Sequence, residues 1–219
     1  MYHKENNYRL FGRTKVRGNK KINFKKYDYL INKYKVTSLN KKDEYILDIG
    51  SGYGETTIHF ALNYKSNKIL SCDKFINGNY NLLKNIEKLN IQNILLHDGN
   101  VLEILDKNIR YEYFTKICIF FPDPWPKKKH FKRRLINVLF LKKIYNYLKS
   151  SGKIIIATDS ISYSRSILKT ISEINFLYEW VNQYSCHLSI KDYLDIETKF
   201  YKKAIICGKK PSIFILKKI

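Results

Sequence analysis

Short apolar runs alternate along this chain with segments in which apolar residues recur every three or four positions. Tyr27, Leu30, Ile31 and Tyr34 have that helical spacing, so a helix is expected over residues 27–36. The same spacing predicts helices over residues 55–64, 77–89, 101–105, 131–148 and 161–173. Apolar runs predict strands over 44–50, 68–73, 93–96, 114–121 and 153–159, with closing strands over 176–184 and 212–217. This alternation predicts an α/β fold, with helices on both faces of a mostly parallel sheet.

Residues 1–26 precede this alternating region and are polar and basic, with Gly12 and Gly18 interrupting any helix. We expect a flexible arm there, which either contacts nucleic acid or is simply solvated. The remaining residues, 27–219, contain no internal repeat and no linker rich in Pro, Gly or Ser, so they are expected to form one domain.

Acidic side chains follow four of the predicted strands. Asp48, Asp73, Asp123 and Asp159 lie at or just past strand ends, and Asn100 follows the third strand. Ligands of open α/β sheets bind at the carboxyl ends of the strands. One acid in such a loop means little, but four along one sheet indicate a binding site.

The first strand runs into a glycine loop, Asp48-Ile-Gly-Ser-Gly-Tyr-Gly-Glu55. Such a loop is also compatible with a plain strand-to-helix turn. Glu55 replaces the last glycine of the dinucleotide fingerprint, and no Gly-Lys-Ser/Thr follows as in a P-loop. Flanking acids repel a pyrophosphate but favour the sulfonium and ammonium groups of S-adenosylmethionine. Asp73, 19 residues beyond Gly54, is suited to bind two ribose hydroxyls, or alternatively to cap a helix.

The fourth strand delivers the most distinctive stretch, residues 120–134. Asp123 stands between two prolines, Trp125 follows, and six Lys or Arg residues occupy the eight positions from Lys127 to Arg134. Trp125 suits either stacking on a base or packing in the core. The basic residues fall in the first turn of the predicted helix, where they oppose the helix dipole, which favours a functional reason for them.

The overall charge supports a polyanionic partner. The chain has 41 Lys and Arg against 19 Asp and Glu, a formal charge of +22, which favours nucleic acid over a membrane. No apolar signal sequence or membrane-spanning segment is visible, so we expect a cytoplasmic protein. The four cysteines, Cys72, Cys118, Cys186 and Cys207, contain no CxxC pair, so reduced thiols are expected and no metal site.

The stretch Phe-Pro-Asp-Pro-Trp followed by Lys-x-x-His-x-Lys-Arg-Arg resembles the hallmark of the bacterial tRNA (guanine-N7-)-methyltransferases. Phe11-Gly12-Arg13, Leu47-Asp-Ile-Gly-Ser-Gly52, Ala157-Thr-Asp159 and Thr198-Lys-Phe200 resemble further motifs of that family. The resemblance implies a Rossmann-like class I methyltransferase with a seventh, antiparallel strand. It also implies methyl transfer from S-adenosylmethionine to N7 of the guanine at position 46, in the variable loop of tRNA. No metal is implied, and a monomer or homodimer without an obligate protein partner is expected.

The resemblance also assigns roles residue by residue. It implies that Asp123 is catalytic. The cofactor contacts that we expect, from the glycine loop and the resemblance together, are Asp48, Gly50, Gly52, Asp73 and Asn100. The implied substrate and RNA contacts are Lys127, Lys129, His130, Phe131, Lys132, Arg133, Arg134, Asp159, Thr198, Lys199, Phe200 and Tyr201.

The sequence departs from the family pattern at three places: Tyr201 replaces a Glu, Lys203-Ala204 replaces an Arg-Gly, and Asn100 stands where many relatives have Asp. Three alternatives remain at this point: a methyltransferase acting on another nucleic-acid atom, a non-catalytic RNA-binding module, and an NAD-linked enzyme, which Glu55 disfavours.

Overall fold

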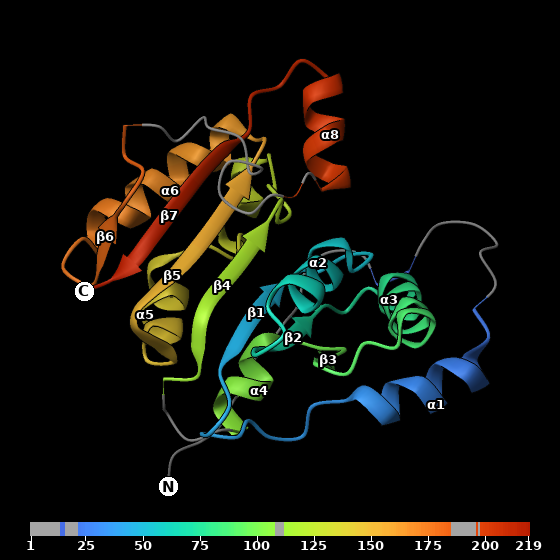
Figure 1. The fold of residues 1–219 in the computed structure, drawn as a ribbon. Helices are drawn as coiled ribbons and strands as arrows, with labels where there is room; N and C mark the ends of the chain where they lie inside the picture. The colour runs from blue at the N-terminus through green and yellow to red at the C-terminus, as the bar shows by residue number, and fades with distance from the viewer. Residues whose placement is uncertain (1–13, 16–21, 108–111, 185–195, 197) are drawn as a thin grey trace, which may run out of the picture.

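The computed structural model describes residues 14–15, 22–107, 112–184, 196 and 198–219 (Figure 1). Its α-helices are α1 (Phe24–Tyr34), α2 (Glu55–Asn63), α3 (Ile76–Leu89), α4 (Val101–Lys107), α5 (Val138–Tyr145), α6 (Ile161–Glu173) and α8 (Lys199–Ile206), and a 3₁₀ helix, η1, covers Lys128–Arg133. Its strands are β1 (Tyr45–Ile49), β2 (Lys68–Cys72), β3 (Ile94–His97), β4 (Phe114–Phe120), β5 (Leu148–Thr158), β6 (Tyr178–Trp180) and β7 (Ser212–Lys218). Most of the predicted arm, and Cys186, lie outside the described residues.

The strands form one seven-stranded sheet in the order β3-β2-β1-β4-β5-β7-β6. Strands β1 to β5 pair in parallel, and β7 pairs antiparallel with both β5 and β6. Helices α1, α2 and α3 cover one face of the sheet, and α4, α5 and α6 cover the other (Figure 1). The predicted three-layer fold with an antiparallel seventh strand is therefore confirmed.

Burial on both faces explains why the central strands are nearly continuous apolar runs. The five residues of β1 are all buried, and so are the last four of β4. Because parallel strands end at the same edge, this arrangement brings the residues after β1, β2, β3, β4 and β5 together. Helix α8 stands at that same edge of the sheet (Figure 1).

The region after β4 differs from the predicted helix over 131–148. The chain instead forms η1, becomes extended at Arg134 and restarts as α5 at Val138, where the Asn137 side chain caps the helix by accepting from Phe140 N. Strand β5 also begins earlier than predicted, at Leu148, because residues 149–152 form an irregularity in the β4–β5 pairing rather than a helix end. Ser151 has a φ of 61° there. The closing strand predicted over 176–184 is only three residues long, and α8 was not predicted.

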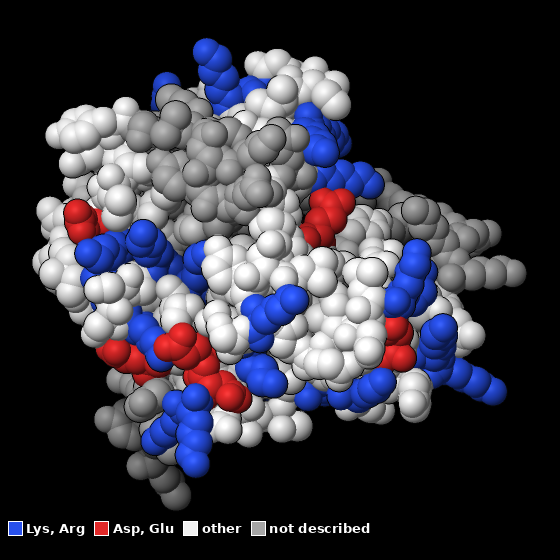
Figure 2. All heavy atoms as spheres, viewed as in Figure 1, with Lys and Arg blue, Asp and Glu red and all other residues white. Residues whose placement is uncertain are grey.

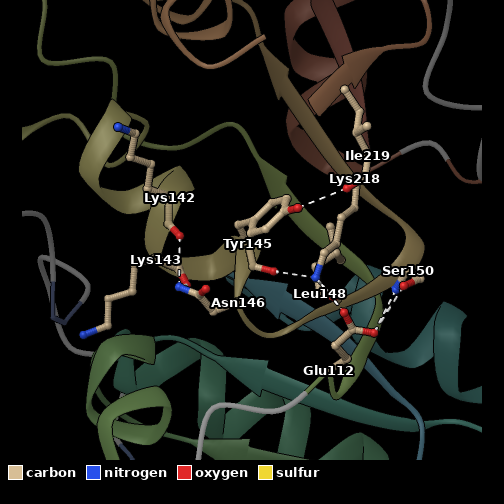
Figure 3. A network of polar contacts seen from close by, with 9 residues as sticks. All are labelled: Glu112, Lys142, Lys143, Tyr145, Asn146, Leu148, Ser150, Lys218 and Ile219. Carbon is tan, nitrogen blue, oxygen red and sulfur yellow. Dashed lines mark hydrogen bonds and ion pairs between the residues drawn. The ribbon is translucent and has the colours of Figure 1, made fainter. Parts of the chain in front are cut away.

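The C-terminal strand is anchored by a lysine that reaches under the α5–β5 connection (Figure 3). Lys218 Nζ donates to Glu112 Oε1 at 2.8 Å and to the carbonyl oxygens of Tyr145 and Leu148 at 3.2 and 2.8 Å. Glu112 in turn accepts from Ser150 N at 3.1 Å. One ammonium group therefore ties β7 to the chain segments that lead into β4 and β5.

Basic side chains are spread over the face seen in Figure 2 rather than gathered in one patch. A separate observation comes from the strand pairing: Lys116, Lys153 and Lys217 are direct register partners on β4, β5 and β7 and form a row across the sheet. Side chains two residues apart on a strand point to the same face of the sheet. The three lysines are each two residues from a buried residue that packs on the face covered by α1, α2 and α3, so all three lysines lie on that face. Glu179 of β6 is the next partner beyond Lys217. The row brings like charges side by side, which is unfavourable for folding.

Candidate active site

The glycine loop after β1 lies against the start of α3. Gly54 has a φ of 84°, and a Cβ there would come within 2.6 Å of the Leu82 side chain, so the position requires glycine. A Cβ on Gly78 would meet the carbonyl oxygen of Gly52 at 1.9 Å. At Gly50, with a φ of 76°, a Cβ would meet nothing within 4 Å. The loop therefore packs tightly on α3 but leaves open space at Gly50.

Asp73, at the end of β2, supports this loop with its carboxylate. Its Oδ2 accepts from Gly52 N at 2.8 Å, and its Oδ1 accepts from Phe75 N at 2.9 Å. Burial raises the pKa of Asp73, and these backbone hydrogen bonds oppose that rise. Each carboxylate oxygen retains a lone pair for a further donor.

Asp48 lies beneath the loop and is only 2% exposed. Its Oδ2 accepts from Thr57 Oγ1 of α2 at 2.7 Å. Burial raises the pKa of Asp48 from 3.8 to about 7, the Thr57 hydrogen bond lowers it, and the charge of Asp73 adds to the rise. A positive charge brought to the loop would favour the ionised form of this acid.

Asn100 is buried at the start of α4. Its Oδ1 accepts from Leu102 N at 3.0 Å. Its backbone oxygen lies 3.0 Å from His97 Nε2, which also lies 3.0 Å from Glu103 Oε2. The side-chain oxygen of Asn100 is thus used within the loop, and the amide NH₂ group makes no hydrogen bond within the described part of the chain.

The loop after β4 holds Asp123 in an exposed position between two residues with unusual backbone geometry. Phe121 and Trp125 have φ values of 51° and 43°, in the left-handed region that non-glycine residues rarely adopt. Phe121 N donates to Ala157 O of β5 at 2.8 Å. The charge of Asp123 raises the pKa of Lys74, at the end of β2, although burial lowers it more. The charges of Asp123 and Lys74 therefore act on each other across the end of β1, which lies between β2 and β4 in the sheet.

Trp125 is half-buried at the surface and is not a core residue. Its ring makes an edge-on contact with His130, at 5.7 Å between centroids, and the Arg133 guanidinium lies 4.9 Å from its centroid. Partial burial lowers the pKa of His130, and the charges of Arg133, Lys129 and Lys127 lower it further.

The basic block divides into exposed and buried members. Lys127, Lys128, Lys129 and Lys132 are exposed, and Phe131 is 39% exposed. Arg134 is buried, and its guanidinium bonds to the Asp123 loop and to the start of α6. The block lies on η1, a short 3₁₀ helix, so the prediction that it forms the first turn of a long α-helix is wrong.

Helix α8 spans the gap between the glycine loop and the Asp123 loop. Thr198 caps it by accepting from Tyr201 N at 3.2 Å, and Glu55 Oε2 of α2 accepts from Lys199 N at 2.8 Å. Phe200 stacks on Phe121 with 6.2 Å between ring centroids, and its ring would lie 3.9 Å from a Cβ on Gly52. The Lys199 ammonium lies 5.4 Å from the centroid of the Tyr53 ring.

Asp159 lies at the end of β5, at the same edge of the sheet. Its Oδ2 accepts from Lys209 Nζ at 2.5 Å, and this bond raises the pKa of Lys209. Lys209 belongs to the connection between α8 and β7, so Asp159 is tied to the segment that carries α8.

Comparison with known proteins identifies the family to which this chain belongs. A family model described as "Putative methyltransferase" matches residues 42–212. The tRNA (guanine-N(7)-)-methyltransferase of Buchnera aphidicola subsp. Acyrthosiphon pisum (strain Tuc7) is 35% identical over 185 residues, 84% of this chain and 76% of that protein. The enzyme of the same name from Wolbachia pipientis wMel is 30% identical over 195 residues, 85% and 84% of the two chains. The one from Neorickettsia sennetsu is 32% identical over 135 residues, and the match spans 62% of its length.

This chain belongs to the tRNA (guanine-N(7)-)-methyltransferase family. Solved structures support the fold: an rRNA methylase from Streptococcus thermophilus aligns over 92% of this chain and 99% of its own, with a TM-score of 0.52 and 15% identity. An antibiotic-related methyltransferase aligns over 96% and 98%, with a TM-score of 0.51 and 16% identity. The methyl donor of this methyltransferase is S-adenosylmethionine.

The residues at the carboxyl edge of this tRNA (guanine-N(7)-)-methyltransferase family member fit that methyl donor. A Cβ on Gly50 would meet open space, and the Asp73 carboxylate supports the same glycine loop. The Asn100 amide at the end of the neighbouring strand β3 is a further hydrogen-bond donor. Among the described residues, no three His, Cys, Asp or Glu side chains are placed to hold a metal ion. None of the described helices has the length and apolar character needed to span a membrane.

Three features of the site were not predicted. Glu55 was interpreted as a missing glycine and as one of the acids that flank the loop, but not as an acceptor for the first turn of α8. The burial of Arg134 and the electrostatic effect of Asp123 on Lys74 depend on the packing of distant segments, which the sequence of either segment does not indicate. The one local signal for α8 was Thr198, a helix-capping residue type, followed by Phe200 and Ala204 at helical spacing.

Proposed function

We propose that this protein transfers the methyl group of S-adenosylmethionine to N7 of a guanine in tRNA, at position 46 in the variable loop. The observation that carries the proposal is the exposed Asp123 carboxylate, which stands at the carboxyl edge within electrostatic reach of Lys74, the residue next to Asp73. The family membership gives the reaction class. The exposure of Asp123 at this edge of the sheet supports its role as the acceptor for the base.

The cofactor would be held by the residues at the ends of β1, β2 and β3. Asp73 would accept hydrogen bonds from the two ribose hydroxyls while it keeps its bonds to the loop. The Asn100 amide would donate to the adenine edge. Gly50 and Gly52 would allow close approach of the backbone. Asp48, beneath the loop, would act through its charge on the cationic part of the cofactor.

The chemistry requires little from the protein beyond orientation and charge. When bound, S-adenosylmethionine supplies an electrophilic methyl group. Guanine N7 carries a free lone pair and no proton, so no general base is needed and the main task is alignment. Asp123 would accept from guanine N1–H and N2–H₂. Methylation makes the ring cationic and N1–H more acidic, so the carboxylate binds the transition state more tightly than the substrate.

The RNA would lie along η1 and α8. The exposed lysines Lys127, Lys129 and Lys132 would contact phosphates, with His130, Phe131 and Arg133 beside them. The sequence-derived substrate contacts Asp159 and Thr198, Lys199, Phe200 and Tyr201 lie on the same edge, which supports their assignment.

The remaining sequence predictions complete this proposal. The chain would act as one catalytic domain over residues 27–219, with residues 1–26 as a basic arm that contacts tRNA. It would work in the cytoplasm, as a monomer or a homodimer.

The decisive experiment is incubation of the protein with S-adenosylmethionine, radiolabelled in the methyl group, and a tRNA transcript. The product is then cleaved chemically at N7-methylguanine, and a transcript with adenine at position 46 is the control. We expect label and cleavage at position 46 alone. Label on N1, N2 or a ribose, or equal labelling of the control transcript, would overturn the assignment. Asp123→Asn is expected to reduce turnover by about a hundredfold while cofactor affinity stays within about twofold.

A further inference from the structure

Arg134 differs from every lysine in the basic block because it is only 4% exposed. Its Nε donates to the carbonyl oxygen of Pro124 at 2.9 Å. Its two terminal nitrogens donate to Ser162 at the start of α6: Nη1 to the carbonyl oxygen at 3.1 Å and Nη2 to Oγ at 3.0 Å. These hydrogen bonds use one N–H group on each of the three guanidinium nitrogens, and the burial of the side chain leaves little of it accessible to a phosphate.

Aromatic rings hold the guanidinium plane in place. Its central carbon lies 3.7 Å from the Phe131 ring centroid and 4.9 Å from that of Tyr163. The Tyr163 hydroxyl accepts from Ile136 N at 2.9 Å, so this ring is itself fixed. No carboxylate forms an ion pair with Arg134 in the described part of the chain. A buried arginine bonded to backbone and hydroxyl oxygens, without an acid, indicates a role in fixing a loop.

The loop that Arg134 holds is strained. Pro124, whose carbonyl accepts the Nε hydrogen bond, directly follows Asp123 and stands between the two left-handed residues Phe121 and Trp125. Non-glycine residues in that region cost energy and persist only where neighbouring groups hold them. On the far side, Phe121 is held by Ala157 and by the Phe200 ring. Arg134 supplies the corresponding restraint on the side of Trp125.

We propose that Arg134 is a positioning residue: it bonds Pro124 and Ser162 together and thereby fixes the direction of the Asp123 carboxylate toward the target guanine. This inference rests on the proposed function for the role of Asp123, and it assigns to Arg134 a task other than RNA binding. Lysine would not replace it, because one ammonium group can neither match the planar set of three bonds nor stack between two rings in the same way.

Arg134→Lys tests this assignment because it retains the charge. We expect kcat for tRNA methylation to fall roughly 10- to 100-fold, since a small displacement of a reacting group has that effect. The KM for tRNA should stay within about twofold, and the salt dependence of tRNA binding should not change. Lys132→Ala, on an exposed neighbour, should show the opposite pattern, with a raised KM and a salt slope smaller by about 0.9. Lys169→Ala, on the exposed face of α6, is the control for surface substitution.

A second measurement reports on the loop without using catalysis. In a Trp180→Phe background, Trp125 is the remaining tryptophan, and its quenching by acrylamide measures how well the loop is held. Arg134→Lys should increase that quenching, and Ser162→Ala, which removes one acceptor, should increase it less. Circular dichroism and cofactor affinity confirm that each variant is folded.

The outcomes separate the two proposals. Unchanged kcat and quenching in Arg134→Lys, together with a raised KM and a smaller salt slope in Arg134→Ala, would make Arg134 a phosphate contact and overturn the positioning role. If the unsubstituted protein methylates no tRNA, the proposed function fails, and the quenching of Trp125 in Arg134→Lys still decides whether Arg134 fixes the loop.

Discussion

Asp48 gives the structure its sharpest thermodynamic prediction. The carboxyl group is buried beneath the glycine loop with the Thr57 hydroxyl as its hydrogen-bond partner, and burial raises its pKa from 3.8 to about 7. An acid whose pKa is higher in the folded state binds its proton more tightly when folded. The free energy of unfolding is therefore highest below the unfolded pKa and falls as the pH rises from about 4 to about 7.

The size of this effect follows from the difference between the two pKa values. At about 1.4 kcal/mol per pKa unit, a rise from 3.8 to about 7 corresponds to about 4 kcal/mol of lost stability above pH 7. Asp48→Asn removes the ionisation and keeps a side-chain amide that can still bond Thr57. The variant should gain stability relative to the unsubstituted protein as the pH rises, by about 1.4 kcal/mol per unit, and level off near pH 7.

Urea unfolding of the cofactor-free protein at half-unit steps from pH 5 to pH 9 measures this difference. Asp28→Asn, on the exposed side of α1, controls for the loss of one carboxylate. A difference between Asp48→Asn and the unsubstituted protein that stays constant from pH 5 to pH 8 would refute the reasoning. So would a difference that shrinks with rising pH, because Asp48 would then be stabilised in its ionised form.

Other features of the structure give predictions of different kinds. Glu55→Ala removes the carboxylate that accepts a hydrogen bond from Lys199 N in the first turn of α8. Amide hydrogen exchange in residues 199–206 should therefore accelerate about fivefold. Unchanged exchange would show that the Thr198 cap alone is enough to hold the start of the helix. Lys218→Met deletes the ammonium that bonds Glu112 and two carbonyl oxygens, and should lower the free energy of unfolding by about 2–3 kcal/mol in urea titrations; a loss below about 0.5 kcal/mol would contradict this. Of the six Lys and Arg residues in the basic block, the four lysines between residues 127 and 132 are exposed. Four phosphate contacts predict that tRNA affinity falls about a hundredfold between 50 and 200 mM salt. A thousandfold loss in a filter-binding assay would correspond to six contacts and would include Arg134 among them.

The sequence predicted the sheet well because its signals are local. The runs that end at Asp48, Asp73 and Asp159 are apolar and bounded by polar residues, so the strand ends were located within a few residues. The same local logic failed at Ser151. A left-handed residue beside a glycine ends helices and also occurs in strand irregularities, and only the pairing of β4 with β5 decides between them.

The site was predictable in its residue types but not in its contacts. The acids that follow predicted strands can be found in the sequence. Because parallel strands end at the same edge of the sheet, these acids are expected to lie close together. The division of the basic block is not visible, because Arg134 is buried by Ser162 and Tyr163, which are 28 and 29 residues further along the chain. The helix predicted over 131–148 failed for the same reason: the Tyr163 hydroxyl binds Ile136 N, where a continuous helix would need that N–H group.

The cross-strand row of Lys116, Lys153 and Lys217 has a consequence for how ionic strength acts on this protein. Part of the repulsion is moderated, because the Lys116 ammonium bonds the Tyr64 hydroxyl at 3.0 Å and lies over its ring. The remainder, in a chain with a formal charge of +22, is screened by salt, so added salt stabilises the free fold. The same salt weakens phosphate binding. Free protein and RNA-bound protein therefore respond to salt in opposite directions, and their melting temperatures converge as the ionic strength rises.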